Sequence, residues 1–207
     1  MSTASLVTEE KELTDEQLFE SFRTEGDQEA LVELIRRYER PLYRYLVRYC
    51  GDTTRAEDLF QTTFARVIER SDQFTAGRRI KPWLYGIATH CAIDARRRAA
   101  RQKPLEVQVD DEDSTSRLGT VLELLTDREP APSARLEREE SQAAIRAAVD
   151  SLPEDWRSIV ILAYYEGLTL AETAEALNTP LGTVKSRLHK ALLALHRKCS
   201  GSDMAGE

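Results

Sequence analysis

The feature that most constrains the fold lies near the C-terminus, where two helix-forming segments are separated by a short turn. Thr169 and Glu172 match a capping box, which predicts the start of a helix in the segment "TLAETAEALN". Asn178 can adopt the left-handed conformation that ends a helix, and Thr179 followed by Pro180 is typical of the start of another. Two helices joined by so tight a turn, the second of them basic, predict a helix-turn-helix.

The second helix of this pair contains no acidic residue over 179–198, although the 207-residue chain has a formal net charge of -7. At about 100° per residue, its apolar side comprises Leu181, Val184, Leu188, Ala191, Leu192 and Leu195. The opposite side carries Lys185, Ser186, His189 and Lys190, with Arg187 at its margin. Such a strip of donors suits phosphates and base edges in the major groove, which carboxylates would repel. The pattern favours a DNA-binding helix over the alternative, an ordinary solvated face.

The composition predicts an all-α protein. Hydrophobic residues make up 41% and charged residues 31% of the chain, glycine and proline are sparse, and no convincing strand pattern occurs. No apolar run approaches the roughly 20 residues of a membrane span, and the N-terminus lacks a signal-peptide pattern, so we expect a cytoplasmic protein. The three scattered cysteines indicate reduced thiols, and no motif indicates a metal, a cofactor or a catalytic centre.

Charge changes sign along the chain. Basic residues dominate 78–103, acidic residues dominate 105–140, and the last helix is basic again. This pattern predicts two contacts with a polyanion, joined by an acidic connector.

The N-terminal block has its own helix start and stop signals. Gly26 is expected to end one helix and Asp27 to begin the next, which continues to Gly51 with a kink at Pro41. Capping boxes at Thr14 with Gln17 and at Thr54 with Glu57 predict the starts of two helices. Pro82 is predicted to be the first residue of another helix. In the helix expected after Thr54, apolar residues lie on one side and polar residues on the other. From periodicity alone, this pattern is explained by an ordinary amphipathic helix.

Four stretches, in this order, resemble those of the extracytoplasmic-function sigma factors of the bacterial sigma-70 family. They are "AEDLFQTTFARVIER", "RRIKPWLYGIATHCAIDARRRAAR", "LPEDWRSIVILAYYEGLTLAETAEAL" and "TPLGTVKSRLHKALLAL". The resemblance implies two small helical domains, the region 2 bundle and the region 4 helix-turn-helix, joined by a flexible linker. It also implies a non-enzymatic factor that binds core RNA polymerase, recognises the −35 and −10 promoter elements and promotes transcription initiation.

The expected boundaries follow from this resemblance and from the composition. They are a disordered N-terminus over 1–13, region 2 over 14–103, an acidic linker over 104–135, region 4 over 136–199 and a disordered tail over 200–207. The linker is either a solvated spacer or, as the resemblance implies, a segment that threads toward the RNA exit path. A short helix is expected within it at 117–125.

The resemblance assigns three sets of site residues. The set for core polymerase, meaning the β′ clamp helices and the β subunit, is Asp58, Gln61, Thr62 and Phe64. The set for −10 DNA is Arg78, Arg79, Trp83, Tyr85, Thr89, His90, Arg96 and Arg97. The set for −35 DNA is Thr183, Lys185, Ser186, Arg187, His189 and Lys190.

Helical geometry refines these sets. Phe64 is expected to hold its helix in its own core, and Trp83 can equally be explained by core packing. Thr89, Arg96 and Arg97 are expected on the outer side of their helix, with His90 near the boundary. Many members of the family carry Asn where this chain has His90, after a basic residue in place of Thr89, which leaves the −10 base preference open.

Two further expectations concern partners and alternatives. The resemblance implies control by an anti-sigma protein, and association with the nucleoid as part of the polymerase holoenzyme, with no stable membrane contact of the chain's own. The alternative functions are a stand-alone helix-turn-helix regulator, which would bind duplex DNA unaided, and a nucleic-acid enzyme, for which the chain carries no catalytic motif.

Overall fold

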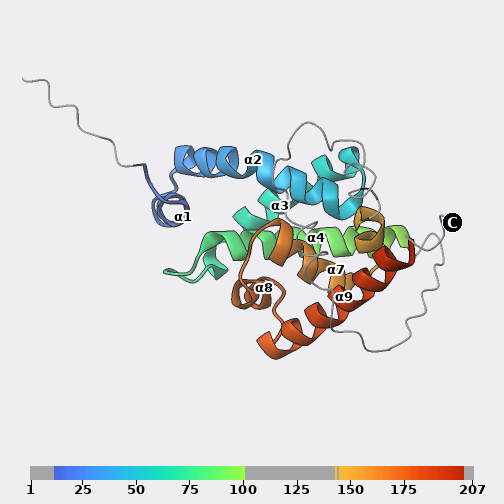
Figure 1. The fold of residues 1–207 in the computed structure, drawn as a ribbon. Coiled ribbons are helices and arrows are strands. Elements are labelled where there is room, and N and C mark those ends of the chain that lie inside the picture. The colour runs from blue at the N-terminus through green and yellow to red at the C-terminus, as the bar shows by residue number, and fades with distance from the viewer. Residues whose placement is uncertain (1–11, 101–142, 144, 203–207) are drawn as a thin grey trace, which may run out of the picture.

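The computed structural model describes residues 12–100, 143 and 145–202, and every regular element in these ranges is a helix. The N-terminal bundle is made of four helices and a short 3-10 turn (Figure 1): α1 Asp15–Glu25, α2 Gln28–Cys50, α3 Thr53–Glu69, η1 Ser71–Gln73 and α4 Ile80–Ala100. The C-terminal block contains a helical segment at 145–150, followed by α7 Glu154–Val160, η3 Ile161–Tyr165, α8 Leu170–Ala176 and α9 Leu181–Ser202. The prediction of an all-α fold is confirmed for these residues.

Most of the predicted helix ends are confirmed because local side chains satisfy the exposed backbone groups. Thr14 forms the predicted capping box, Asp27 accepts from two backbone amides at the start of α2, and Gly26 has a positive φ of 73°. Asn178 is left-handed, with φ 47°, and lies between α8 and α9. Helix α2 continues through Pro41.

Three predicted helix ends are wrong by a few residues. Asp52, and not Thr54, caps α3: its carboxylate accepts from the Arg55 amide at 3.0 Å. Helix α4 begins at Ile80, so that Pro82 lies within its first turn, where a missing amide proton costs no helical bond. Helix α9 runs from Leu181 to Ser202, so it begins one residue after the predicted first position, Pro180, and the Thr179 hydroxyl donates to the Leu177 carbonyl oxygen instead of capping α9.

The loop before α4 is held by an aromatic cluster. Phe74 is buried and meets Phe19 of α1 and Trp83 of α4, each with ring centroids 5.2 Å apart. Phe19 and Trp83 also lie 5.3 Å apart, within the range of favourable aromatic pairs. This cluster fixes both ends of the loop that carries Arg78 and Arg79.

The two blocks are packed against each other, which the sequence did not predict. Figure 1 shows α4 lying between α2 and α3 on one side and α7 to α9 on the other. Buried residues of both blocks form one continuous hydrophobic core. We call the surface where α2 and α4 meet α7, η3 and α8 the seam. On one side lie Tyr49, Arg48, Lys81 and Gly86, and on the other Arg157, Glu166, Glu172 and Ala176.

Several predictions lie outside the described residues. They concern the N-terminus up to residue 11, the acidic linker with its short helix, and the end of the tail from residue 203.

Candidate functional site

The strip of polar residues on α9 is exposed as predicted. Lys185, Ser186, His189 and Lys190 are all exposed. The opposite side packs inward through Val184, Leu188, Ala191, Leu192 and Leu195, each 9% exposed or less. Leu181 departs from the predicted inner side, because it lies in the first turn of the helix and is 40% exposed.

Two other members of the −35 set are half-buried. Arg187 forms an ion pair with Asp155 of α7 at 3.0 Å, which holds its guanidinium beside the strip. Thr183 lies one turn earlier, and its carbonyl oxygen accepts a hydrogen bond from Ser186 at 3.1 Å. The structure therefore brings the six predicted residues together on the N-terminal half of one helix.

The predicted polymerase face on α3 is also exposed. Asp58, Gln61 and Thr62 point to solvent, and the Thr62 hydroxyl donates to the Asp58 carbonyl one turn earlier. Phe64 is only 5% exposed and packs beside Phe60, so the expectation that it holds the helix in its own core is confirmed. The face thus offers one carboxylate and two uncharged polar groups to a partner.

Three of the four arginines of the predicted −10 set are exposed and paired with carboxylates. Arg78 pairs with Glu175 at 2.9 Å and Arg79 with Glu172 at 2.5 Å, so that both bond to α8. Arg97 lies 3.4 Å from Glu154 at the start of α7. Each of these arginines comes from the N-terminal bundle, and each carboxylate comes from the C-terminal block.

His90 and Arg96 complete the outer part of this set. His90 is exposed, and its Nδ1 donates to the Gly86 carbonyl oxygen at 2.6 Å; Arg96 is half-buried. Trp83 is also half-buried and belongs to the aromatic cluster, which agrees with its interpretation as a packing residue.

The predicted outer position of Thr89 is wrong, and Tyr85 is buried as well. Both residues have 0% exposure. The Thr89 hydroxyl donates to the Tyr85 carbonyl and lies 2.6 Å from the Tyr45 hydroxyl of α2. Thr89 is buried because α4 is covered on two sides, by α2 and α3 on one and by α8 on the other, so that the side predicted to face solvent is also packed. In this arrangement neither residue can reach DNA.

The seam contains functional candidates that sequence reasoning did not single out. Glu166 is largely buried, and its Oε1 lies 3.8 Å from Nη1 of Arg48, while its backbone oxygen accepts from Lys81 at 2.7 Å. Burial raises the pKa of Glu166, although the Tyr85 hydroxyl, Arg48 and Lys81 act in the opposite direction. The signal available beforehand was an acidic residue directly after an apolar run, in "ILAYYE".

Arg157 and Tyr49 form the buried centre of the same surface. The Arg157 guanidinium lies 4.6 Å from the ring centroid of Tyr49, and the Tyr49 hydroxyl lies 2.8 Å from the Ser158 hydroxyl. Arg157 is 1% exposed, and its Nε and Nη2 atoms have no hydrogen-bond partner among the described residues. Stacking on an aromatic ring is one of the ways in which a buried guanidinium is stabilised.

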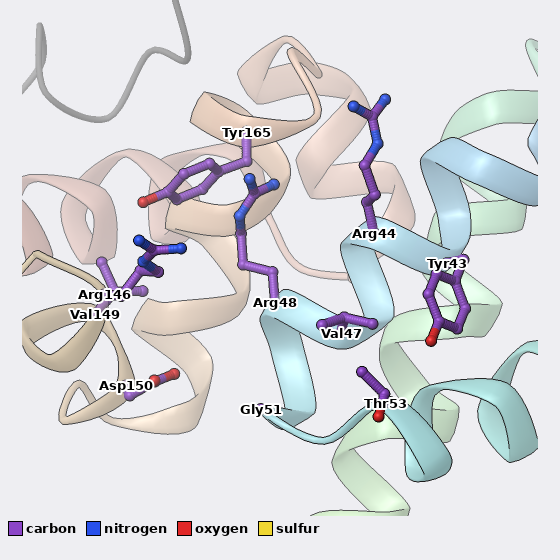
Figure 2. A pocket seen from close by; sticks show the side chains of 10 residues that line it. All are labelled: Tyr43, Arg44, Val47, Arg48, Gly51, Thr53, Arg146, Val149, Asp150 and Tyr165. Carbon is purple, nitrogen blue, oxygen red and sulfur yellow. The ribbon is translucent and has the colours of Figure 1, made fainter. Parts of the chain in front are cut away.

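A cavity of about 440 Å³ opens beside the seam, between α2 and the C-terminal block (Figure 2). Its charged lining residues are Arg44, Arg48, Arg146 and Asp150. Figure 2 shows Arg48 and Arg146 pointing toward Tyr165, whose ring centroid lies 4.0 Å from the Arg48 guanidinium. Burial raises the pKa of Asp150, while Arg96 acts in the opposite direction.

Two other kinds of site are absent from the part of the chain that the structure describes. No cluster of His, Cys, Asp and Glu is placed to hold a metal ion. None of the helices found there is long and apolar enough to cross a membrane.

Comparisons with known proteins agree with the two blocks. The pattern of Sigma-70 region 2 matches residues 34–102, and that of Sigma-70, region 4 matches residues 142–195. The ECF RNA polymerase sigma factor SigW of Bacillus subtilis (strain 168) is 32% identical over 173 residues, which cover 84% of this chain and 90% of the relative.

Two solved structures share the fold. One is CnrH in complex with the cytosolic domain of CnrY, with a TM-score of 0.61, 20% identity and coverage of 93% of this chain and 99% of that one. The other is the sigma factor RpoE in complex with the anti-sigma factor NepR from Bartonella quintana, with a TM-score of 0.58, 21% identity and coverage of 82% and 96%. With both regions matched in order and a relative of this identity along most of its length, the chain belongs to the extracytoplasmic-function sigma factors of the sigma-70 family, which direct RNA polymerase to promoters.

Proposed function

We propose that this sigma factor divides its work among three surfaces. The exposed face of α3 docks on the β′ clamp helices of core polymerase, with the β subunit as a further contact. The loop before α4 and the outer part of α4 grip and help to open the −10 element. The strip on α9 reads the −35 element in the major groove.

The observation that carries this proposal is the arrangement of α9. Four polar donors lie exposed on one side, directly opposite five buried apolar residues. A helix held in this way can enter the major groove without losing its own packing. Lys185 and Lys190 suit phosphate oxygens or guanine edges, and Ser186 and His189 can supply polar contacts to bases.

The −10 proposal is narrower than the set predicted from sequence. Arg78, Arg79 and Arg97 have exposed guanidinium groups that suit backbone phosphates. His90 is exposed and can donate to a base edge or stack on it. The buried Tyr85 and Thr89 support α4 from within and make no direct contact in this proposal.

The proposal for α3 depends on the chemistry of its face. Asp58 supplies a charge, while Gln61 and Thr62 supply uncharged polar groups, and all three are exposed. The proposal further includes an anti-sigma protein as a partner, because both fold relatives were solved as complexes, one with an anti-sigma factor and one with the cytosolic domain of CnrY. It places the chain in the cytoplasm, at the nucleoid when it is bound to polymerase.

The test is reconstitution with core polymerase. The purified chain should co-purify with core polymerase and direct run-off transcription from start sites mapped after its overexpression. A stand-alone regulator would instead bind duplex DNA unaided and leave core polymerase uncaptured. Failure to direct initiation at any mapped start site would refute the proposal.

A further inference from the structure

Acidic residues of the C-terminal block lie against the arginines assigned above to −10 DNA. We propose that, in the closed form of the chain, these carboxylates occupy the positions that DNA phosphates would take on Arg78 and Arg79, so that the two arginines are engaged before DNA arrives. The inference rests on the proposed −10 role of Arg78 and Arg79. The two surfaces involved are the loop before α4 and the acidic face of α8.

The ion pairs have the chemistry of a phosphate contact. The guanidinium groups of Arg78 and Arg79 lie 2.9 and 2.5 Å from carboxylate oxygens of Glu175 and Glu172. A guanidinium binds carboxylate and phosphate oxygens with the same donors, so one ligand excludes the other. DNA can therefore bind these two arginines only after the carboxylates have moved away.

Glu172 is fixed in position for this role. Its carboxylate caps its own helix by accepting from the Thr169 amide at 2.9 Å. This backbone hydrogen bond is the largest cause that lowers the pKa of Glu172, and Arg79 acts in the same direction. The group therefore stays ionised and needs no reorientation to meet Arg79.

Exposed ion pairs alone would not hold the two blocks together, because such pairs contribute little to stability. The buried part of the seam supplies the rest. The Tyr49 and Ser158 hydroxyls meet there at 2.8 Å, and Arg157 stacks on Tyr49. Packing in the seam thus holds the two blocks together. The exposed carboxylates of Glu172 and Glu175 then engage Arg79 and Arg78.

Gly86 gives a way to separate the blocks without changing any charge. A Cβ atom added at Gly86 would lie 2.5 Å from the carbonyl oxygen of Ala176, and the three nearest atoms all belong to the Ala176 backbone. Backbone atoms cannot move aside as a flexible side chain can. Alanine is a better helix former than glycine, so Gly86→Ala should leave α4 intact and act only where α8 approaches it.

The experiment uses the full chain without polymerase. The probe is a fluorescent single-stranded DNA oligonucleotide of mixed sequence, followed by anisotropy, and the radius of gyration is measured by small-angle X-ray scattering. Gly86→Ala should increase the radius of gyration and tighten oligonucleotide binding by about tenfold, as expected when two cationic contacts become available. Adding Arg78→Gln and Arg79→Gln to that variant should cancel the gain in binding.

A second variant tests the carboxylates directly. Glu172→Gln with Glu175→Gln should also tighten binding, whereas Glu25→Gln with Glu29→Gln, an equal charge change at exposed sites on α1 and α2, should not. If Gly86→Ala fails to fold, as judged by circular dichroism, this pair decides the question. Unchanged oligonucleotide binding in the folded variants would overturn the inference, as would an equal gain in the Glu25 and Glu29 control.

The outcome is distinguishable from a failure of the proposed function. Run-off transcription by the wild-type chain with core polymerase tests the proposed function alone. A chain that directs initiation, but whose seam variants bind the oligonucleotide no better than wild type, would retain its function and lose only this inference.

Discussion

The two surfaces proposed to contact promoter DNA are presented in different ways. On α9, the exposed strip lies in a segment, 179–198, that contains no carboxylate. Before α4, Arg78 and Arg79 are also exposed to water, but each is paired with a carboxylate of α8. In the −35 set, Arg187 at the margin of the strip pairs with Asp155, whereas in the −10 set Arg78, Arg79 and Arg97 are all paired with carboxylates. The −10 surface must therefore exchange more carboxylates for phosphates.

This difference explains how an acidic chain can serve as a DNA-binding protein. The formal net charge of -7 is a sum over surfaces of opposite sign. Within the C-terminal block, Glu154, Glu172 and Glu175 all pair with arginines of the N-terminal bundle, on surfaces that α9's strip does not share. Net charge therefore says less about this chain than the location of each charge.

The largest predicted effect concerns α3, whose face is exposed in the same way as the strip on α9. Asp58→Lys with Gln61→Lys should weaken capture of core polymerase by at least about a hundredfold, because charge reversal at the centre of an interface costs several kcal/mol. Pull-down with core polymerase measures the loss. Gln28→Lys with Glu29→Lys, on the exposed first turn of α2, is the matched control and should retain capture. Equal loss in both variants would contradict the assigned face.

The next prediction tests the difference between the two surfaces, through the weak binding of duplex DNA that we expect of the chain alone at low salt. Lys185→Glu with Lys190→Glu should weaken this binding by roughly tenfold or more, because each lost phosphate or base contact costs about 1–3 kcal/mol. Arg78→Glu with Arg79→Glu should change it much less, since these arginines are already paired. Arg36→Glu with Arg40→Glu, both at exposed positions of α2, gives the same change in net charge and is the control. Similar losses of DNA binding in the two double variants would show that both surfaces are equally accessible, which would contradict the proposed difference between them.

A smaller effect, on the stability of the fold, is expected for a substitution on the inner side of α4. Thr89→Val should destabilise the fold by about 1–3 kcal/mol, because it removes a buried hydroxyl and leaves the Tyr45 hydroxyl without that partner. Chemical denaturation measures the change in the free energy of unfolding. Thr24→Val is the control: Thr24 also donates to a carbonyl one turn earlier, but it is exposed and should be nearly neutral. A neutral Thr89→Val would reopen a role for Thr89 at the surface.

The smallest effect is a pH dependence of the seam. Burial raises the pKa of Glu166 above its ordinary value of 4.5, with Arg44 and Arg48 of α2 and Lys81 and Tyr85 of α4 facing it. A carboxyl with a raised pKa stabilises the closed form fully below that ordinary value, and this contribution is lost as pH rises through the raised pKa.

Lowering the pH from neutral toward the ordinary pKa of glutamate should therefore slow opening of the seam. Hydrogen exchange at the Leu168 amide, which bonds across the turn to Leu162, measures this after correction for the intrinsic rate. Glu166→Gln should reduce the pH dependence, and what remains is assigned to Asp150, whose pKa is also raised by burial. Glu172 does not interfere in this range, because its pKa is lowered and its contribution is lost only at more acidic pH. A wild-type seam that loosens on acidification would contradict the prediction.

Local signals explain what the sequence could predict. Capping boxes, glycine ends and helical periodicity depend on neighbours along the chain, so the ends of α1 and α8 and the two sides of α9 could be predicted. The position of Thr89 could not, because it depends on α2 and α8 covering α4 from two directions. The same holds for Glu166 and Arg157, whose partners lie far away in the sequence.

The π-helical turn between α7 and α8 sets the direction in which Glu166 points. Residues Ile161–Tyr165 form a π-helical turn, in which the Glu166 amide bonds to the Ile161 carbonyl five residues earlier. Such a turn holds one residue more than an α-helical turn, so an α-helical register would rotate everything after it by about 100°. Glu166 would then face away from Arg48 and Lys81, with every side chain unchanged. Deletion of a single residue here would thus turn Glu166 and the helix after it away from α4, while the contact of Tyr49 with Ser158, which precedes the turn, would stay in place.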